Sequence, residues 1–368
     1  MTAQQEPFYK RLSLNLISLA LLGALLYVGQ NIIVPLLFSI LLATLLLPVT
    51  RFLYVRLKFP NVLSIIVSIL VSLLLIVGVI YLLSRQVSLF LEDSDAIKDR
   101  FAELVSSFQG WVDDTFHVNN SAQRQYVKDT MKDVKSSGAG IAGKTFGTLT
   151  EILSYVVFLP LYTFLILFYR GLIKKFLVTV FESASHKQVE DILNESRFVG
   201  QHYVLGLGID MAIVFTLNCI GFLVLGIKYA IFLALVAALL NLIPYIGMLI
   251  ANIFCMLITL ISSDSTSNVL WVAAILGVVQ LIDNNFLMPM IVGNKVKINA
   301  LVTILGVIIG GSLCGVSGMF LAIPAFAVLK VIFDRVDDLK PWGIILGDDL
   351  DSPKGKKSAT KVKSSEED

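Results

Sequence analysis

Two aspartates stand inside segments that are otherwise apolar, and they are the first candidates for chemistry in this sequence. Asp210 lies in the stretch His202–Leu225, about 12 Å along a helix from its start. An ionisable side chain inside a membrane span is costly and is by default a functional candidate. Gly206 and Gly221 lie on nearly the same helix face, so we expect Asp210 to face protein. A buried carboxylate that is paired for structure is the alternative.

Asp283 is the second aspartate, and Asn284 and Asn285 follow it directly. Carboxylate and amide oxygens are the ligands that hard cations prefer, and they also hydrogen-bond polar solutes. The triplet interrupts the apolar run that begins at Val269, shortly before Pro289. It therefore predicts an ion or solute pathway, whereas an ordinary polar loop at the membrane edge is the alternative.

Asn241, with Pro244 and Gly247, is the third candidate cluster and stands in the middle of the charge-free stretch Tyr229–Ser262. Proline removes a helical hydrogen bond, which frees a carbonyl group that could line a pathway. Irregular backbone at membrane depth persists only where protein or a water-filled cavity satisfies it. Broken helices are also where transporters commonly bind their cargo. A kink that serves packing is the alternative.

Other kinds of site are poorly supported. Residues 138–145 match the spacing of a P-loop, but a polar helix is expected before them and a membrane span after them, where the P-loop needs a strand and a soluble helix. His117, His186 and His202 lack metal-ligand spacing, and the sequence has no G-x-S-x-G nucleophile elbow. We therefore expect no enzyme activity, no metal site and no cofactor.

The composition indicates what kind of chain must position these residues. Hydrophobic residues make up 56% of 368 positions and charged residues only 15%, against about a quarter charged in soluble proteins. A soluble protein this apolar could not bury what it carries. The net charge of +2 gives no indication of nucleic-acid binding. The cysteines all lie in apolar runs and are interpreted as packing residues without disulfides: Cys219, Cys255 and Cys314.

Apolar segments long enough to cross a bilayer define the predicted fold. A hydrocarbon core about 30 Å thick needs about 20 helical residues. The fold class is therefore all-α, a polytopic transmembrane protein with about eight spans, of which the sixth and eighth are too long for one straight crossing and must be broken or re-entrant. The predicted spans are Leu12–Gly29, Ile32–Val55, Val62–Leu83, Leu149–Tyr169, His202–Leu225, Tyr229–Ser262, Val269–Val292 and Ile298–Leu329.

The chain divides into four predicted parts. Residues 1–83 carry the N-terminal spans and residues 149–334 form a C-terminal transmembrane core. Between them, residues 84–148 read as an extracytoplasmic insert, because apolar residues from Ile97 to Trp111 repeat at helical spacing among charges. An amphipathic stretch at 171–199 suits an interfacial helix. Residues 335–368 are predicted to be a charged cytoplasmic tail that is largely disordered.

Lysine and arginine near the spans predict the orientation. One set of short loops, with both terminal segments, is rich in these residues, whereas the alternate loops carry only Lys228, Lys295 and Lys297. Both termini are therefore expected in the cytoplasm and the 84–148 insert outside, in a prokaryotic inner membrane. Small-residue repeats favour close contacts between spans or between subunits, and they comprise Gly306, Gly310, Gly311, Gly315 and Gly318.

Several of these motifs occur together in a known family. Gly200-Gln201 opens a span, residues 239–247 surround the Asn241 break, residues 280–289 with Gly293 surround Asp283, and Gly310-Gly311, Gly315, Gly318 and Ile323-Pro324 follow in order. In this arrangement the sequence resembles the autoinducer-2 exporter family of prokaryotic transporters. The resemblance covers most of the chain and is most specific from about 198 to 333. Met248 departs from it, since a proline is expected after Gly247.

The resemblance implies export of a small polar solute, with the signal autoinducer-2 as the namesake, or Na⁺(Li⁺)/H⁺ antiport. It implies a homo-oligomer, expected to be a pentamer, and it adds Gln201 and Pro289 to the candidate pathway. Three classes of function stay open: a transporter driven by an ion gradient, a passive channel, and a membrane scaffold without transport. An ion-coupled transporter fits the intramembrane carboxylates and the missing ATPase, and its partners are the solute or a monovalent cation and the lipid bilayer.

Overall fold

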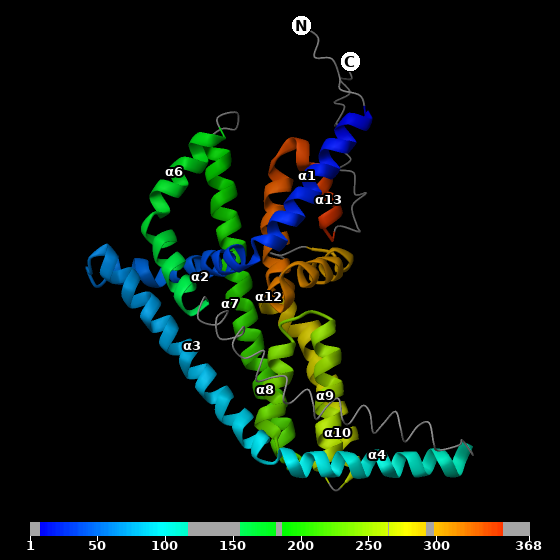
Figure 1. Cartoon of the computed structure of the whole chain (residues 1–368). Coiled ribbons are helices and arrows are strands. Elements are labelled where there is room, and N and C mark those ends of the chain that lie inside the picture. The colour runs from blue at the N-terminus through cyan, green and yellow to red at the C-terminus, as the bar shows by residue number, and fades with distance from the viewer. Residues whose placement is uncertain (1–7, 117–154, 182–185, 264, 292–297, 349–368) are drawn as a thin grey trace, which may run out of the picture.

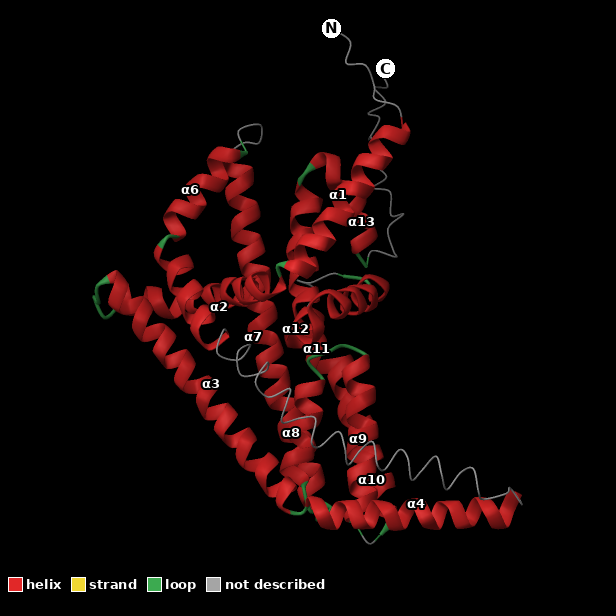
Figure 2. Cartoon of the chain, in the orientation of Figure 1, coloured by secondary structure: helices red, strands yellow, loops and turns green. Residues whose placement is uncertain are grey.

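The computed structural model describes residues 8–116, 155–181, 186–263, 265–291 and 298–348. Within these ranges every regular element is a helix and no strand occurs (Figure 2). The all-α prediction is therefore confirmed. Residues 138–145 and most of the C-terminal tail, which carry the P-loop-like pattern and the predicted disorder, lie outside the described ranges.

Five helices in the described ranges are long and apolar enough to cross a membrane. A sixth candidate is a pair of helices, Tyr155–Phe168 and α6 (Arg170–Val180), which are bent by 67° at Tyr169. Two of the eight predicted spans become shorter apolar helices, which accounts for the lower number. The first is α1 (Phe8–Val28), and the sixth folds into two short helices. The five are α2 (Gln30–Val55), α3 (Asn61–Glu92), α7 (His186–Val224), Thr266–Ile291, which begins with α10 (Thr266–Ile282), and α12 (Ala300–Arg335).

The boundary predicted at residue 84 falls inside a helix. α3 continues to Glu92, and α4 (Ser94–Phe116) starts after a single residue, Asp93. The polar residues after Leu83 are compatible with helix, so loss of hydrophobicity did not end it. α4 is amphipathic, as predicted, and lies across the ends of α8, α9 and α10 (Figure 1).

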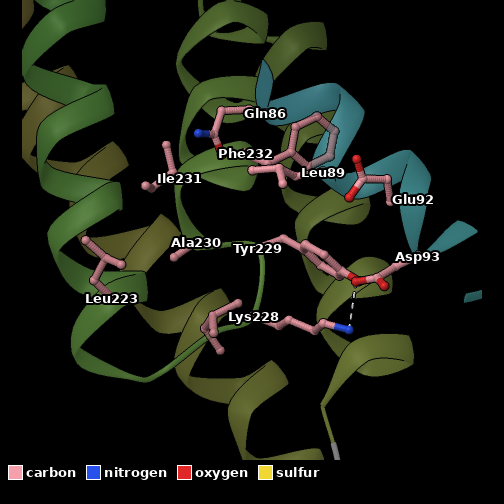
Figure 3. Close-up of a pocket in the computed structure, with 11 residues that line it drawn as sticks. Gln86, Leu89, Glu92, Asp93, Leu223, Lys228, Tyr229, Ala230, Ile231 and Phe232 are labelled. Atoms are coloured by element: carbon pink, nitrogen blue, oxygen red, sulfur yellow. Dashed lines mark hydrogen bonds and ion pairs between the residues drawn. The ribbon is translucent and has the colours of Figure 1, made fainter. Parts of the chain in front are cut away.

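Asp93 holds the corner between α3 and α4 to the rest of the protein (Figure 3). Its carboxylate accepts a hydrogen bond of 2.7 Å from the Tyr229 hydroxyl and lies 2.8 Å from Lys228 Nζ. These contacts, the bond from Lys228 foremost, hold the pKa of the Asp93 carboxyl below its ordinary value. Phe90 stacks on Phe232 with ring centroids 4.6 Å apart. The corner is thereby attached to the chain that leads into α8.

The predicted broken span Tyr229–Ser262 is a helical hairpin. α8 (Ala230–Leu240) and α9 (Ile246–Ser262) run side by side, since Cys255 Sγ donates to the Leu233 carbonyl oxygen at 3.6 Å. The turn depends on two residues. Tyr245 adopts a φ of +62°, which non-glycine residues rarely accept. A Cβ at Gly247 would lie 1.8 Å from the Leu240 carbonyl oxygen, so only glycine fits there.

α12 also reverses direction, at Cys314 and Gly315, where Gly315 has a φ of +60°. The predicted small-residue repeats pack its two arms against each other. A Cβ at Gly310 would lie 2.4 Å from the Gly318 carbonyl oxygen, and one at Gly306 would lie 2.4 Å from Phe326 Cε2. Gly311 faces Met319 in the same way. These glycines therefore serve a contact within one hairpin, while a role between subunits stays a prediction.

The tail predicted to begin at 335 is ordered for its first part. A 3₁₀ turn, Asp337–Leu339, leads into α13 (Lys340–Leu346), which packs on α12. Asn299 Nδ2 donates to the carbonyl oxygens of Ile345 at 2.7 Å and Gly347 at 2.9 Å. Leu346 is buried. These contacts order residues that composition alone assigns to a disordered tail.

The main core lies where α7, α8, α9 and α10 meet. Its fully buried members come from all four helices, and α4 covers one end through Ile97. A second, smaller core joins α2 and α3 to the helix Tyr155–Phe168. The core helices carry the polar residues singled out in the sequence, and the site is built between them. The buried centre of the main core comprises Phe222, Leu233, Ala234, Cys255 and Val272.

Candidate functional site

Asp210 and Asp283 meet inside the protein, and the side chain of Asn241 joins them. Asn241 Nδ2 donates to Asp283 Oδ2 at 3.0 Å and to Asp210 Oδ2 at 3.4 Å. The aspartates are only 1% and 2% exposed. Three elements that are far apart in the sequence thus contribute to one cluster, which we call the carboxylate cluster: Asp210, Asn241 and Asp283.

Two of the four carboxylate oxygens in this cluster are unused as acceptors. Asp210 Oδ1 and Asp283 Oδ1 are buried and have no hydrogen-bond partner in the described structure. Apart from Asn241, the donor near the pair is Gln280 Nε2, at 3.5 Å from Asp283 Oδ2. Two buried carboxylates without enough donors cannot both stay charged at low cost. Uptake of a proton or a cation would relieve this cost.

Each member is positioned by a distinct local feature. Asp210 belongs to the buried stripe of α7, together with Val214 and Asn218 at four-residue spacing. Asn241 sits at the tip of the α8–α9 hairpin, immediately after α8 ends. Asp283 begins a π-helical turn, Asp283–Leu287, that follows α10.

Pro289 gives the physical reason for that π-helical turn. Its ring nitrogen has no hydrogen to donate, and the ring would clash with the carbonyl four residues earlier. The wider π spacing relieves the clash, and such turns are frequent at functional sites. Pro289 itself is exposed and lies outside the cluster. Its part in the site is therefore to shape the backbone.

A pocket of about 410 Å³ opens beside the carboxylate cluster. Its wall combines the hairpin tip, the end of α10 and the start of α12, with Tyr203 and Leu207 from α7. The lining mixes apolar side chains with amide, hydroxyl and carboxyl groups. The lining includes Tyr203, Leu207, Asn241, Leu242, Pro244, Tyr245, Met248, Gln280, Asp283, Asn284, Met288, Ile298, Thr303 and Ile323.

Comparison with known proteins assigns the chain to a family. A family model described as AI-2E family transporter matches residues 16–338. The chain belongs to this family. It is 27% identical over 319 residues to "Putative transport protein YrrI" of Bacillus subtilis (strain 168), covering 82% of this chain and 86% of that protein.

Other relatives agree with this assignment. A "Putative transport protein" of Haemophilus influenzae (strain ATCC 51907 / DSM 11121 / KW20 / Rd) is 25% identical over 330 residues, covering 87% of this chain and 91% of its own. "Putative permease PerM" of Escherichia coli (strain K12) is 26% identical over 137 residues, covering 37% of this chain and 39% of its own. This AI-2E family chain is accordingly a multi-pass membrane protein of a transport family, and the sequence resemblance is confirmed.

The structure of this AI-2E family member brings some predicted site residues together and separates others. Pro244 and Asn284 line the pocket, and Gly247 shapes its wall. Asn285 is exposed, and its amide donates to the Leu281 carbonyl oxygen at 2.8 Å, so it does not complete a shell around Asp283. Gln201 is half-buried on α7 and has no hydrogen bond to the carboxylate cluster.

Most of the lining residues were not predicted from the sequence, and three of them are instructive. Gln280 stands one helical turn before Asp283, and that spacing could have identified it. Tyr203 lies about two turns before Asp210 on α7, but nothing in the sequence distinguishes it from other aromatic residues in apolar runs. Tyr245 has the unusual φ of +62°, which nothing in its residue type predicts. The described residues contain no group of three or more His, Cys, Asp or Glu side chains that could hold a metal ion.

Proposed function

We propose that this AI-2E family member is a secondary transporter that exports a small polar solute and couples export to an ion gradient through the carboxylate cluster. The observation that carries the proposal is the pairing of Asp210 and Asp283 through Asn241, with two buried carboxylate oxygens left without a donor. An ionisable pair buried within membrane helices is costly and is typical of ion pathways and proton relays.

Competition for the two carboxylates provides the coupling. The empty acceptor positions accept either a proton or a partly dehydrated monovalent cation, and full occupancy by one excludes the other. This property supports the second candidate function, Na⁺(Li⁺)/H⁺ antiport, in which the cation is itself the cargo. With two carboxylates and one amide, the cluster has fewer charges than dedicated divalent-cation sites normally offer.

The hairpin tip is the element that would respond to occupancy. Asn241 belongs to the α8–α9 hairpin, whereas Asp210 and Asp283 belong to α7 and the end of α10. Protonation or cation binding changes what the Asn241 amide can hydrogen-bond, and therefore how firmly the tip is held. The strained Tyr245 and the tight Gly247 contact lie in the same turn, where a change in backbone torsion can be absorbed.

The pocket supports a small solute as cargo. A volume of about 410 Å³ falls within the range of small-molecule sites, roughly 300–1,000 Å³. Its mixture of apolar wall and a few amide, hydroxyl and carboxylate groups suits a compact polyhydroxylated molecule such as autoinducer-2. We propose this class of solute and not a large amphipathic one.

The decisive experiment is flux through the purified chain in proteoliposomes. Autoinducer-2 counterflow and dye-reported proton movement on addition of Na⁺ or Li⁺ are measured for wild type, Asp210→Asn and Asp283→Asn. The Asp→Asn change keeps shape and removes charge, so at least one variant should lose the pH dependence of flux while folding normally. Asn285→Ala serves as control, since its amide is not directed at the cluster.

The alternatives give different results in the same assay. A passive channel conducts the solute with no response to pH in wild type or in either Asn variant. A scaffold gives no flux of any probe. Unchanged rates and pH profiles in both Asn variants would remove the carboxylate cluster from the mechanism.

We also propose a cytoplasmic location for both termini in a prokaryotic inner membrane, and a homo-oligomeric assembly, with a pentamer as first expectation. The distribution of Lys and Arg supports the orientation. α4 and α13 lie at opposite ends of the molecule (Figure 1), which agrees with an insert on the side away from the C-terminus.

A further inference from the structure

Tyr203, on α7, is a buried tyrosine whose hydroxyl group has no partner in the protein. The residue is 4% exposed and lines the pocket of about 410 Å³ beside the carboxylate cluster. Its hydroxyl makes no hydrogen bond to any of the residues that the structure describes. It is also not one of the fully buried oxygens without a partner, which belong to other residues. The Tyr203 hydroxyl is therefore left open to the pocket that the residue lines.

The position of Tyr203 separates it from the carboxylate cluster. A buried phenol hydroxyl normally finds a hydrogen-bond partner, because an unmade bond leaves the cost of desolvation uncompensated. Tyr203 and Asp210 lie on nearly the same face of α7, about two turns or 10 Å apart along the axis. Leu207, between them, lines the same pocket. The open hydroxyl thus belongs to the wall of the pocket and not to the ion site.

Other donors in the pocket wall are already used by the protein. Thr303 Oγ1 donates to the Asn299 carbonyl oxygen at 3.0 Å. Gln280 Nε2 donates to Asn284 Oδ1 at 3.1 Å. The Tyr203 hydroxyl differs from these groups, because its partner has to come from outside the described chain.

Gln280 adds an acceptor to the same wall. Its Nε2 group is held by Asn284, whereas its Oε1 oxygen accepts no hydrogen bond from the described residues. An open hydroxyl and an open amide oxygen together match alcohol groups, since an alcohol can accept one hydrogen bond and donate another. Tyr245, the second tyrosine of the lining, is 48% exposed. Water competes for its hydroxyl, so Tyr203 is the stronger candidate for recognising a solute.

We propose that Tyr203 is a specificity-determining residue, whose hydroxyl hydrogen-bonds one alcohol group of the solute while Gln280 Oε1 accepts from another. The pocket accordingly takes a small polyol and discriminates against analogues that lack the recognised hydroxyl, because these leave Tyr203 unpaired. The inference rests on the proposed function, since it concerns the cargo of the same pocket. It does not depend on how transport is coupled to an ion gradient.

The test is binding of autoinducer-2 to the purified full chain in detergent, measured by isothermal titration calorimetry at pH 7 without an ion gradient. Tyr203→Phe keeps the ring and removes one hydrogen bond, so it should weaken binding roughly three- to tenfold. Analogues of autoinducer-2 that each lack one hydroxyl extend the test. Wild type should bind one of them more weakly than the parent by a similar factor, and Tyr203→Phe should bind that analogue and the parent equally.

Tyr162→Phe is the matched control. It removes the same atom from a tyrosine of the helix Tyr155–Phe168, where the ring stacks on Phe158 and lies outside the pocket lining. Its affinity for autoinducer-2 should equal that of wild type. Thermal unfolding of both Phe variants in detergent separates a change in binding from a loss of fold.

Several results would overturn the proposal. Equal affinity of wild type and a folded Tyr203→Phe variant would remove Tyr203 from recognition and leave the proposed coupling through the carboxylate cluster intact. No binding of autoinducer-2 to wild type would reject the polyol, and with it the proposed cargo. Equal weakening in Tyr162→Phe would show that the loss is not specific to the pocket. Should Tyr203→Phe fail to fold, wild type decides, since equal affinity for the parent and every analogue would mean that no hydroxyl is recognised.

Discussion

Replacement of Asn241 by alanine perturbs the carboxylate cluster most directly. Its amide donates to both aspartates, at 3.0 Å and 3.4 Å, and it comes from a different element than either of them. Asn241→Ala removes these donors and leaves both carboxylates in place. The charged form of the pair then loses charge-assisted hydrogen bonds, whereas the protonated form loses only weaker, uncharged ones.

The geometry sets the size of the effect. A hydrogen bond to a charged group contributes about 1.5–3 kcal/mol, and the contribution falls as the bond lengthens. We assign about 2 kcal/mol to the 3.0 Å bond to Asp283 and less than about 1 kcal/mol to the 3.4 Å bond to Asp210. The total loss of the charged form is about 2–3 kcal/mol, and the protonated form loses about 1 kcal/mol. The difference of about 1–2 kcal/mol corresponds to roughly one pH unit, since each tenfold change takes about 1.4 kcal/mol.

The sign follows from which form the amide favours. An N–H donor stabilises ionised oxygens, so its loss means that the proton is held up to higher pH. In proteoliposomes, the midpoint of the pH profile of flux should rise by roughly one unit in Asn241→Ala. Measurements from pH 5 to pH 9 at equal ionic strength would define the midpoint on both sides of neutrality.

A matched variant separates this effect from general damage to the site. Asn285→Ala makes the same substitution two residues beyond Asp283, but the Asn285 amide donates to a helix carbonyl. Its pH profile should equal that of wild type. If Asn241→Ala folds normally and its midpoint stays within half a unit of wild type, the Asp210–Asn241–Asp283 contact does not control proton binding.

Three further predictions follow. Gly247→Ala should lower stability by about 1–3 kcal/mol and impair flux, because the new methyl group meets a backbone carbonyl; thermal unfolding in detergent measures it. Asp93→Asn should speed amide hydrogen exchange in α4 at pH 7, because the corner contacts are weakened. The pKa of Asp93 is lowered in the folded state, so wild type should keep its slow exchange at pH 7 and lose it only as pH falls below 3.8. Single cysteines at Ser106 and Lys340 should label from opposite sides of a sealed membrane.

Each of these has its own control or contrary result. Gly277→Ala on α10 meets nothing within 4 Å and should be neutral or stabilising, so equal loss in both glycine variants would contradict the steric argument. Unaltered α4 exchange in Asp93→Asn would mean that the apolar contacts of Phe90 suffice. Labelling of both cysteines from one side would reject the proposed orientation.

The sequence was informative about which residues are unusual and less so about where they meet. Asp210, Asn241 and Asp283 were each identified because polar groups are costly in apolar helices. Their contacts span 31 and 42 residues along the chain. Such contacts depend on how α7, the hairpin tip and α10 pack, and periodicity within one segment carries no record of that packing.

The glycines also show that a sequence pattern predicts a contact without identifying the partner. Small-residue repeats predict a close helix contact, and the structure contains one between Gly310 and Gly318. The repeat does not specify the partner, which is the other arm of α12 and not a separate span. Asn285 was grouped with Asp283 by adjacency, but neighbouring positions on a helix point about 100° apart. Asn285 lies two positions after Asp283, so about 200° of rotation directs its amide away from the carboxylate cluster.

The α8–α9 hairpin changes how the topology of this chain must be counted. An element that reverses direction returns the chain to the end at which it entered, so it adds an even number of passages and leaves the parity unchanged. A hydropathy profile scores Tyr229–Ser262 as one crossing, which is odd. A reporter fused after Ser262 and before α12 would then be assigned to the wrong side. Scoring α12 as one crossing is a second error of the same kind, because the chain reverses at Gly315, and it cancels the first error for residues after α12.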